Sequence, residues 1–289
     1  MEPRPRSFYL LAAFFALFVV FLYGPSITIA ILSFQGPRGG LTFPMNGVSL
    51  HWFADLFEQQ AVGDIWGSFR RSFALGIMVM VVTVVFSVMG GLAFRNRFRG
   101  SGVLFYVIIA SLIIPSILVS LGVGLIFNIL DLVVHWASSG FGAQLTWTLP
   151  FGLLIMFAIF NRFDRSYEEA ARDLGATPWQ TLRHVVLPII GPSLIGIALF
   201  GFTLSYDEFA RTLLTAGSYN TLPLEIFGMT TNVTSPVLYA LGTLTTLFSF
   251  VIIGSFLTIG LVLRRRRTKL GSDHGHQPMH RSGVHSGAG

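Results

Sequence analysis

Two adjacent carboxylates, Asp207 and Glu208, follow Tyr206 directly at the end of a long apolar run. A carboxylate stabilises an ammonium group by charge-assisted hydrogen bonding, and an aromatic face adds about 0.5–2 kcal/mol by cation–π attraction. Since charge is costly at the bilayer centre, the depth of these side chains decides their role. If Pro188 opens the preceding helix at the inner boundary of the membrane, a rise of about 1.5 Å per residue puts Asp207 near the outer edge of the membrane. The three residues therefore fit either a cation-binding gate or an ordinary solvated interface.

The composition indicates a membrane protein and excludes several classes of site. Of the 289 residues, 53% are hydrophobic and 11% charged, whereas a soluble domain carries about 25% charged residues. No cysteine is present, which excludes disulfides, thiolate metal sites and cysteine nucleophiles. The phosphate loop G-x-x-x-x-G-K-[ST] and the motifs H-E-x-x-H and G-x-S-x-G are also missing, so we expect no catalytic residue, metal or cofactor in this chain. We expect this chain to contact membrane lipid and to bind no nucleic acid.

Long apolar runs predict an all-α, polytopic membrane protein with six transmembrane helices. The runs cover about Phe8–Leu32, Ser72–Phe94, Gly102–Phe127, Thr146–Phe160, Pro188–Tyr206 and Val237–Leu263. Pro115 predicts a kink in the third, and the fourth looks short or tilted. The domains are then a cytoplasmic N-terminus over 1–7, a transmembrane domain over 8–263, and a tail over 264–289. The tail is basic and rich in Gly, Ser and His, and we expect it to be disordered.

The distribution of basic residues predicts that both termini and the polar loop over 161–192 are cytoplasmic. In that layout, most of the 19 Lys and Arg residues are cytoplasmic, and the outer segments contain only Arg38, Arg70, Arg71 and Arg211. The outer segments also hold more acids than bases, namely Asp55, Glu58, Asp64, Asp131, Asp207, Glu208 and Glu225. A net-negative outer face is compatible with a cationic solute.

The loop over 161–192 predicts two short helices joined by a tight turn. Ser166 and Glu169 have the spacing of a capping box, and Gly175 supplies a left-handed residue that ends the first helix near Leu174. Thr177 and Gln180 repeat the box, with Pro178 at the first helical position and the helix ending at Leu187. By itself, such a helix pair would also fit an amphipathic surface lying on a membrane.

This loop resembles the cytoplasmic signature loop of ABC-importer permeases, Glu-Ala-Ala-x3-Gly-x9-Ile-x-Leu-Pro. The matching residues are Glu169, Ala170, Ala171, Gly175, Val185, Leu187 and Pro188, with Val in place of Ile as the one departure. In that family the loop is a coupling helix that docks on the ATP-binding subunit. The resemblance therefore implies a coupling site made of Glu168, Glu169, Ala170, Ala171, Arg172, Gly175, Ala176, Leu187 and Pro188.

The second half of the chain looks like the polyamine (spermidine/putrescine) permeases of the same family. The similar stretches are Ser205–Phe209, Asn220–Ile226 and Met229–Leu241, and the family's permeases for ferric iron, thiamine or oxyanions share much of them. An oxyanion path should contain Arg or Lys, yet no predicted span interior does. Tyr206, Asp207 and Glu208 are then the candidate residues of the substrate path.

The resemblance implies a six-span permease subunit of the ABC-importer fold in a bacterial inner membrane. Its expected partners are a cytoplasmic ATP-binding subunit dimer, where ATP and magnesium would bind, a second permease subunit, and a periplasmic solute-binding protein. A rival from another class is a non-transporting membrane scaffold, or a small channel gated by a soluble protein.

Overall fold

The computed structural model describes residues 5–58, 63–96, 98–232 and 235–273, and the regular elements within these ranges are helices. The predicted all-α class is confirmed. In chain order the elements are α1 (Arg6–Leu32), α2 (His51–Glu58), α3 (Ile65–Phe94), α4 (Ser101–Ile113), α5 (Ser116–Ile129), η2 (Trp136–Gly140), α6 (Phe141–Asn161), α7 (Ser166–Asp173), α8 (Pro178–Thr181), η3 (Leu182–Val186), α9 (Leu187–Tyr206), α10 (Leu222–Asn232) and α11 (Val237–Asp273).

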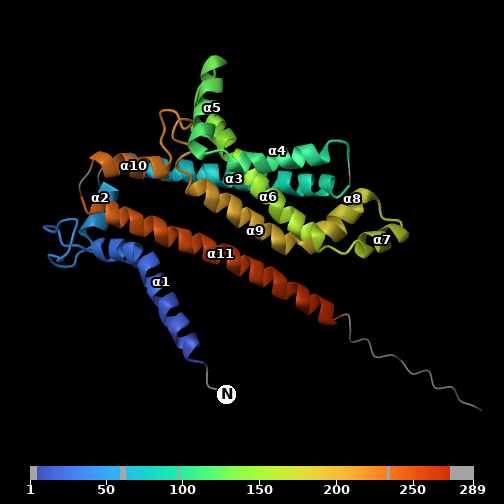
Figure 1. Cartoon of the computed structure of the whole chain (residues 1–289), viewed down its shortest axis with the longest axis horizontal. Coiled ribbons are helices and arrows are strands. Elements are labelled where there is room, and N and C mark those ends of the chain that lie inside the picture. The colour runs from blue at the N-terminus through green and yellow to red at the C-terminus, as the bar shows by residue number, and fades with distance from the viewer. Residues whose placement is uncertain (1–4, 59–62, 97, 233–234, 274–289) are drawn as a thin grey trace, which may run out of the picture. The chain divides into compact units, whose positions relative to one another are not determined.

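The chain divides into two compact units. Unit 1 holds Met1–Phe163 and Ile197–Val251, and unit 2 holds Asp164–Gly196 and Ile252–Gly289. Unit 1 therefore contains α1 to α6 and α10, and unit 2 contains the short helices α7 and α8 with the π-helical turn η3 (Figure 1). The long helices α9 and α11 each have one end in each unit.

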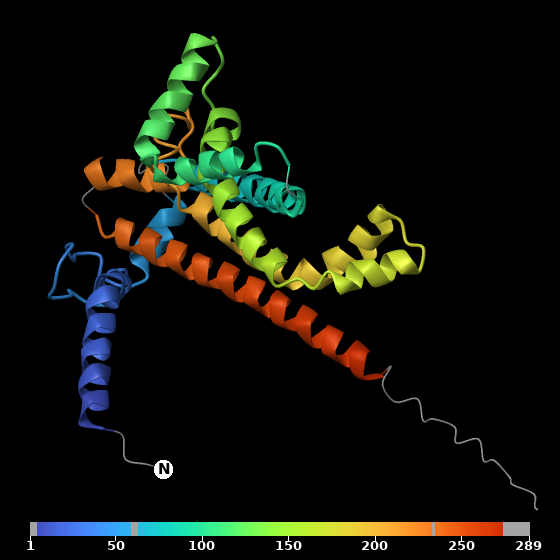
Figure 2. The same cartoon turned by 45° about the vertical axis from the view of Figure 1, so that its right-hand side comes forward.

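Among the described residues, 5 helices are long and apolar enough to cross a membrane, or 6 if one bent pair counts as a single span. The bent pair is α4 and α5, which meet at 106° (Figure 2). Pro115 lies in the break, and Ile114 before it is extended with ψ 126°, because a proline ring clashes with a helical residue in front of it. The kink predicted at Pro115 is confirmed, but the third run is two helices rather than one.

Two predicted helix starts were placed too late. The second span begins at Ile65 rather than Ser72, because the Asp64 carboxylate caps α3 by accepting a hydrogen bond of 2.9 Å from the Gly67 N–H. The fourth candidate span covers Trp136–Asn161, 26 residues, so it is not short. It opens with the π-helical turn η2, where the His135 ring accepts a hydrogen bond from the Ala137 N–H.

The most extensive helix pairing in unit 1 joins α3 to α6. Small residues bring the two backbones together: a Cβ on Gly90 would clash with the Leu153 side chain, and one on Gly152 with the Ser87 hydroxyl. Small residues are common where membrane helices meet, since van der Waals packing holds such helices together. A buried hydrogen bond of 3.0 Å from the Thr83 hydroxyl to that of Thr148 adds a polar link.

Other helices of unit 1 have apolar surface that the described part of the chain leaves uncovered. Helix α4 has no buried residue, and the apolar window of the first span is 0% buried. In a membrane protein such faces contact lipid or another chain.

The end of the last span differs from the prediction. Helix α11 continues to Asp273, so the backbone over 264–273 is helical where the sequence predicted the start of a disordered tail. The rest of that predicted tail, 274–289, lies outside the described residues, as do 1–4 of the predicted N-terminal segment.

Candidate functional site

The first helix of the predicted coupling loop begins differently from the prediction. The capping box of Ser166 and Glu169 does not form, because Ser166 is already the first residue of α7. The N-cap residue is Arg165, which makes no side-chain cap bond, and the Oδ1 of Asp164 accepts a hydrogen bond of 2.9 Å from the Ser166 N–H. This bond holds the pKa of the Asp164 carboxyl below its usual value.

The turn that follows is as predicted. Gly175 has φ +83°, and its N–H donates to the carbonyl of Arg172 while the Ala176 N–H donates to that of Ala171, at 2.8 and 3.0 Å. These bonds cap the end of α7. Thr177 then opens α8 with the predicted capping box, formed in both directions with Gln180.

Unit 2 presents large apolar side chains on this polar loop. The exposed fractions are 54% for Tyr167, 89% for Leu174 and 65% for Trp179. Of the predicted coupling residues, Glu169, Ala170, Arg172 and Gly175 are exposed, while Glu168, Ala171 and Ala176 are half-buried. Exposed apolar side chains with charged neighbours form a surface suited to docking on a protein.

Leu187 and Pro188 belong to a different element from the rest of the predicted coupling site. They are the first residues of α9, which continues directly from η3, so the predicted helix end at Leu187 is wrong. The Leu187 N–H donates to the Leu182 carbonyl, so helical hydrogen bonding runs through the junction, and Pro188 contributes no N–H to it.

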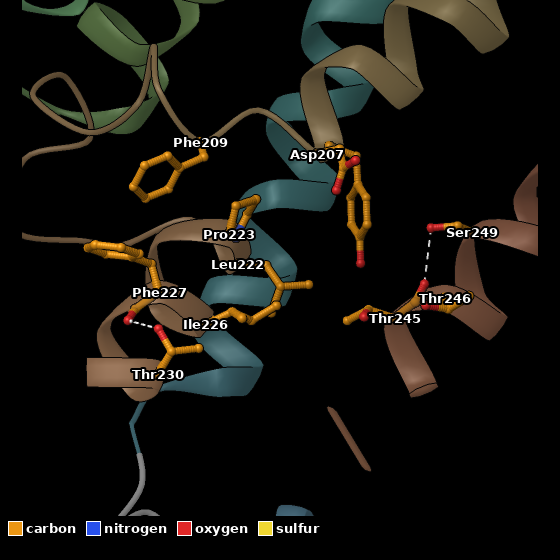
Figure 3. A pocket seen from close by; sticks show the side chains of 11 residues that line it. Asp207, Phe209, Leu222, Pro223, Ile226, Phe227, Thr230, Thr245, Thr246 and Ser249 are labelled. Carbon is orange, nitrogen blue, oxygen red and sulfur yellow. Dashed lines mark hydrogen bonds between the residues drawn. The ribbon is translucent and has the colours of Figure 1, made fainter. Parts of the chain in front are cut away.

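A second candidate site is a pocket of about 520 Å³ in unit 1. Its walls come from the end of α9, the loop after it, α10 and α11 (Figure 3). Tyr206, Phe209 and Phe227 contribute rings, and Asp207 contributes the one charged group. The remaining polar side chains are hydroxyls, from Thr230, Thr245, Thr246 and Ser249. Its volume is in the usual range for small-ligand pockets.

The structure brings two of the three predicted path residues into this pocket. Asp207 is exposed. Tyr206 is only 6% exposed; its ring stacks on Phe202 at 5.7 Å and contacts Phe248 of α11 at 5.4 Å. The Tyr206 hydroxyl is buried without a hydrogen-bond partner in the described part of the chain.

Glu208, the third predicted path residue, lies outside the pocket lining. It is 7% exposed, and its carboxylate accepts a hydrogen bond of 2.8 Å from the Arg211 N–H. Burial raises the pKa of Glu208, although the Arg211 N–H and charge act in the opposite direction. The two adjacent carboxylates therefore have different environments.

Arg211 is a buried residue that the sequence did not single out. Its guanidinium donates to the hydroxyls of Ser116 and Thr146 at 2.6 and 3.3 Å, and lies 4.5 Å from the Trp147 ring centre. Ser116 is the first residue of α5, directly after the break at Pro115. Arg211 thus fixes the loop after α9 to both α5 and α6.

The hydroxyl groups of the pocket were also missed. Thr245, Thr246 and Ser249 stand in an apolar run at spacings that share a helix face, and that pattern is the signal that could have found them. No sequence pattern connects them to Asp207, because α10 and the loop before it intervene.

Comparison with known proteins identifies the kind of protein that shares these features. The family described as "Binding-protein-dependent transport system inner membrane component" matches residues 84–267. That range contains the loop of α7 and α8, and all the pocket residues.

Two curated relatives cover most of the chain. The spermidine/putrescine transport system permease protein PotC of Haemophilus influenzae is 29% identical over 251 residues, which are 85% of this chain and 94% of PotC. The putrescine transport system permease protein PotI of Escherichia coli is 30% identical over 238 residues, 78% of this chain and 81% of PotI.

A solved structure shares the fold. It is a bacterial ABC transporter involved in the import of the acidic polysaccharide alginate, and the match has a TM-score of 0.62. The match covers 91% of this chain and 99% of that chain, at 19% identity.

Proposed function

This chain belongs to the inner membrane component family of binding-protein-dependent transport systems, as a permease of an ABC importer, and we propose that its solute is a polyamine such as putrescine or spermidine. It is a multi-pass inner membrane protein. With a second permease subunit it forms the path for the solute, which a periplasmic binding protein delivers.

The observation that carries this proposal is the chemistry of the pocket next to Asp207. The pocket combines one exposed carboxylate with aromatic rings and hydroxyls, and none of its lining residues is Lys or Arg. A carboxylate beside aromatic faces suits an ammonium group attached to an aliphatic chain. The similarity to PotC and PotI supports the same solute class.

The loop of α7 and α8 supports a coupling role. Leu174 and Trp179 offer apolar contacts, and the exposed charges of Glu169 and Arg172 offer polar ones. We infer that this surface docks on a cytoplasmic ATP-binding subunit dimer, which binds ATP and magnesium and supplies the energy for transport. Catalysis then belongs to that subunit.

Docking there requires both termini and the loop of unit 2 to be cytoplasmic. Reporter fusions at Gly175 and Gly271 should give cytoplasmic signals, and fusions at Gly40 and Gly217 periplasmic ones. A periplasmic signal at Gly175 would contradict the coupling role.

Uptake of labelled putrescine and spermidine by cells carrying the complete system tests the solute. We expect uptake by the wild type and a decrease of about tenfold or more for Asp207→Asn, since hydrogen bonds to charged groups contribute about 1.5–3 kcal/mol. Asp131→Asn is the matched control. It also removes an acid, Asp131 is outside the pocket lining, and its φ of 52° suits asparagine.

Two results would count against the proposal. No uptake of either polyamine by the intact system would reject the solute class, and uptake of labelled ferric iron or thiamine would then replace it. Full uptake by Asp207→Asn would remove Asp207 from the path.

A further inference from the structure

The pocket lining contains five hydroxyl groups, and the four that belong to Thr and Ser have all used their protons. Thr245 and Thr246 both donate to the Gly242 carbonyl, at 3.0 and 2.7 Å. Ser249 donates to the Thr245 carbonyl at 3.0 Å and Thr230 to that of Phe227 at 2.7 Å (Figure 3).

A hydroxyl has one proton and two lone pairs, so each of these groups can only accept a further hydrogen bond. The Asp207 carboxylate is likewise an acceptor when ionised. None of the lining residues is Lys, Arg, His, Trp, Asn or Gln, the types whose side chains always carry N–H donors or can carry them. Apart from the hydroxyl of Tyr206, which can still donate, the side chains around this pocket therefore offer only acceptors.

Tyr206 adds an independent observation. This residue lines the pocket, and its exposed fraction is only 6%. Its hydroxyl has no hydrogen-bond partner in the described residues. A buried polar group without a partner costs free energy. A ligand that hydrogen-bonds to this hydroxyl would remove that cost.

We propose that this acceptor pocket binds an alkylammonium group, with Asp207 supplying the charge and the hydroxyls of α10 and α11 supplying the selectivity. The proposal rests on the proposed function in taking a polyamine as the solute, and it adds a site and the residues that define it. An ammonium brings three N–H donors and no acceptor, which matches the lining. A carboxylate or phosphate brings acceptors, which would oppose the lone pairs already there.

The apolar part of the pocket suits the carbon chain of such a ligand. Leu222, Pro223 and Ile226 line it, and the rings of Phe209 and Phe227 meet at 4.9 Å between centres. Burying methylene groups against these surfaces favours a linear aliphatic amine over a free ammonium ion.

Equilibrium binding to the purified transporter complex in lipid nanodiscs tests the site without transport. The probe is radiolabelled putrescine, with butylamine, 1-butanol and butyrate as competitors of the same carbon number. We expect butylamine to displace the probe, and 1-butanol and butyrate not to do so. Displacement by butyrate as effective as that by butylamine would overturn the proposal.

The hydroxyls are tested by Thr245→Val, Thr246→Val and Ser249→Ala combined. These changes remove acceptors while keeping nearly the same shape, and we expect probe affinity to fall by about tenfold or more. Thr243→Val is the control, because Thr243 makes the same kind of bond, to the Tyr239 carbonyl at 2.8 Å, outside the lining. If the triple variant fails to fold, Thr246→Val alone replaces it, since Thr246 is exposed. Unchanged affinity in a folded variant would overturn the role of the hydroxyls.

The binding and uptake results separate the two proposals. Hydroxyl-dependent binding of putrescine without polyamine uptake by the intact system would reject the proposed function and keep the site. Polyamine uptake with binding that is insensitive to the hydroxyls would keep the function and reject the site.

Discussion

Arg211 and Glu208 form a buried ion pair in the loop that follows α9. A guanidinium nitrogen of Arg211 lies 3.7 Å from a carboxylate oxygen of Glu208, and the exposed fractions of the side chains are 3% and 7%. Arg211 also donates to hydroxyls of α5 and α6. The pair therefore holds the loop that begins with Asp207 against the two helices on either side of η2.

Breaking this pair should destabilise the protein strongly. In Arg211→Met, Glu208 stays buried without its counter-charge, and we expect a loss of about 3–5 kcal/mol in unfolding free energy. Thermal unfolding of the purified complex measures the loss as a lower Tm. The double variant Glu208→Gln with Arg211→Met should recover much of it, because no uncompensated charge remains.

Arg38→Met is the control, since Arg38 is exposed and should shift Tm little. A double variant that is less stable than Arg211→Met alone would contradict the explanation by charge.

The turn of the coupling loop should be sensitive to β-branching at Gly175. A valine there must adopt a φ near +83°, which is strained for a branched side chain. We expect Gly175→Val to insert into the membrane but to lose most solute uptake and solute-dependent ATPase activity. Gly175→Asn should keep both, because asparagine tolerates left-handed backbone. Wild-type uptake by Gly175→Val would disprove the coupling assignment.

The start of α3 should lose stability in acid. Asp64 accepts a hydrogen bond from the Gly67 N–H and another, of 2.9 Å, from Arg71, and these hold its pKa below the usual 3.8. Since the folded pKa is the lower one, the stabilisation is complete above pH 3.8 and declines as pH falls through the folded pKa. Hydrogen-exchange protection at Gly67 and Ser68, corrected for intrinsic rates, should fall over that range.

Asp64→Asn keeps a capping oxygen without the charge, so its protection factors should depend much less on pH. The same acid-induced loss in that variant would assign the effect to another group.

Tyr206→Phe should separate stability from binding. Because the hydroxyl is buried and has no partner among the residues that the structure describes, its removal should leave Tm unchanged or raise it. The ring contacts with Phe202 and Phe248 remain. Putrescine affinity should nevertheless decrease severalfold, as one acceptor is lost. A lower Tm together with unchanged affinity would show that the hydroxyl serves the fold instead.

The features that the sequence predicted well depend on neighbouring residues. Gly175 and the box of Thr177 and Gln180 are set by backbone chemistry within a few positions, and the structure has both. The break at Pro115 is equally local. The box at Ser166 does not form because the Ser166 N–H, which the Glu169 side chain would accept from, donates to Asp164 instead.

The features that the sequence missed depend on residues far apart in the chain. Arg211 is buried because Ser116, Thr146 and Trp147 surround its guanidinium, and no local pattern shows this. The acceptor pocket likewise needs α10 and α11 placed beside Asp207. Periodicity locates helices, but it does not say which polar faces meet.

The uncovered surface of α4 and of the first span has a consequence for biogenesis. In a soluble protein, an apolar helix with no buried residue would not stay folded against its neighbours, because its apolar surface would remain exposed to water. In a bilayer, lipid supplies that compensation, and every backbone hydrogen bond is made within the helix. These helices can therefore be inserted and remain stable before any subunit arrives. Assembly can then follow synthesis as a separate event, in which lipid on these faces is exchanged for protein.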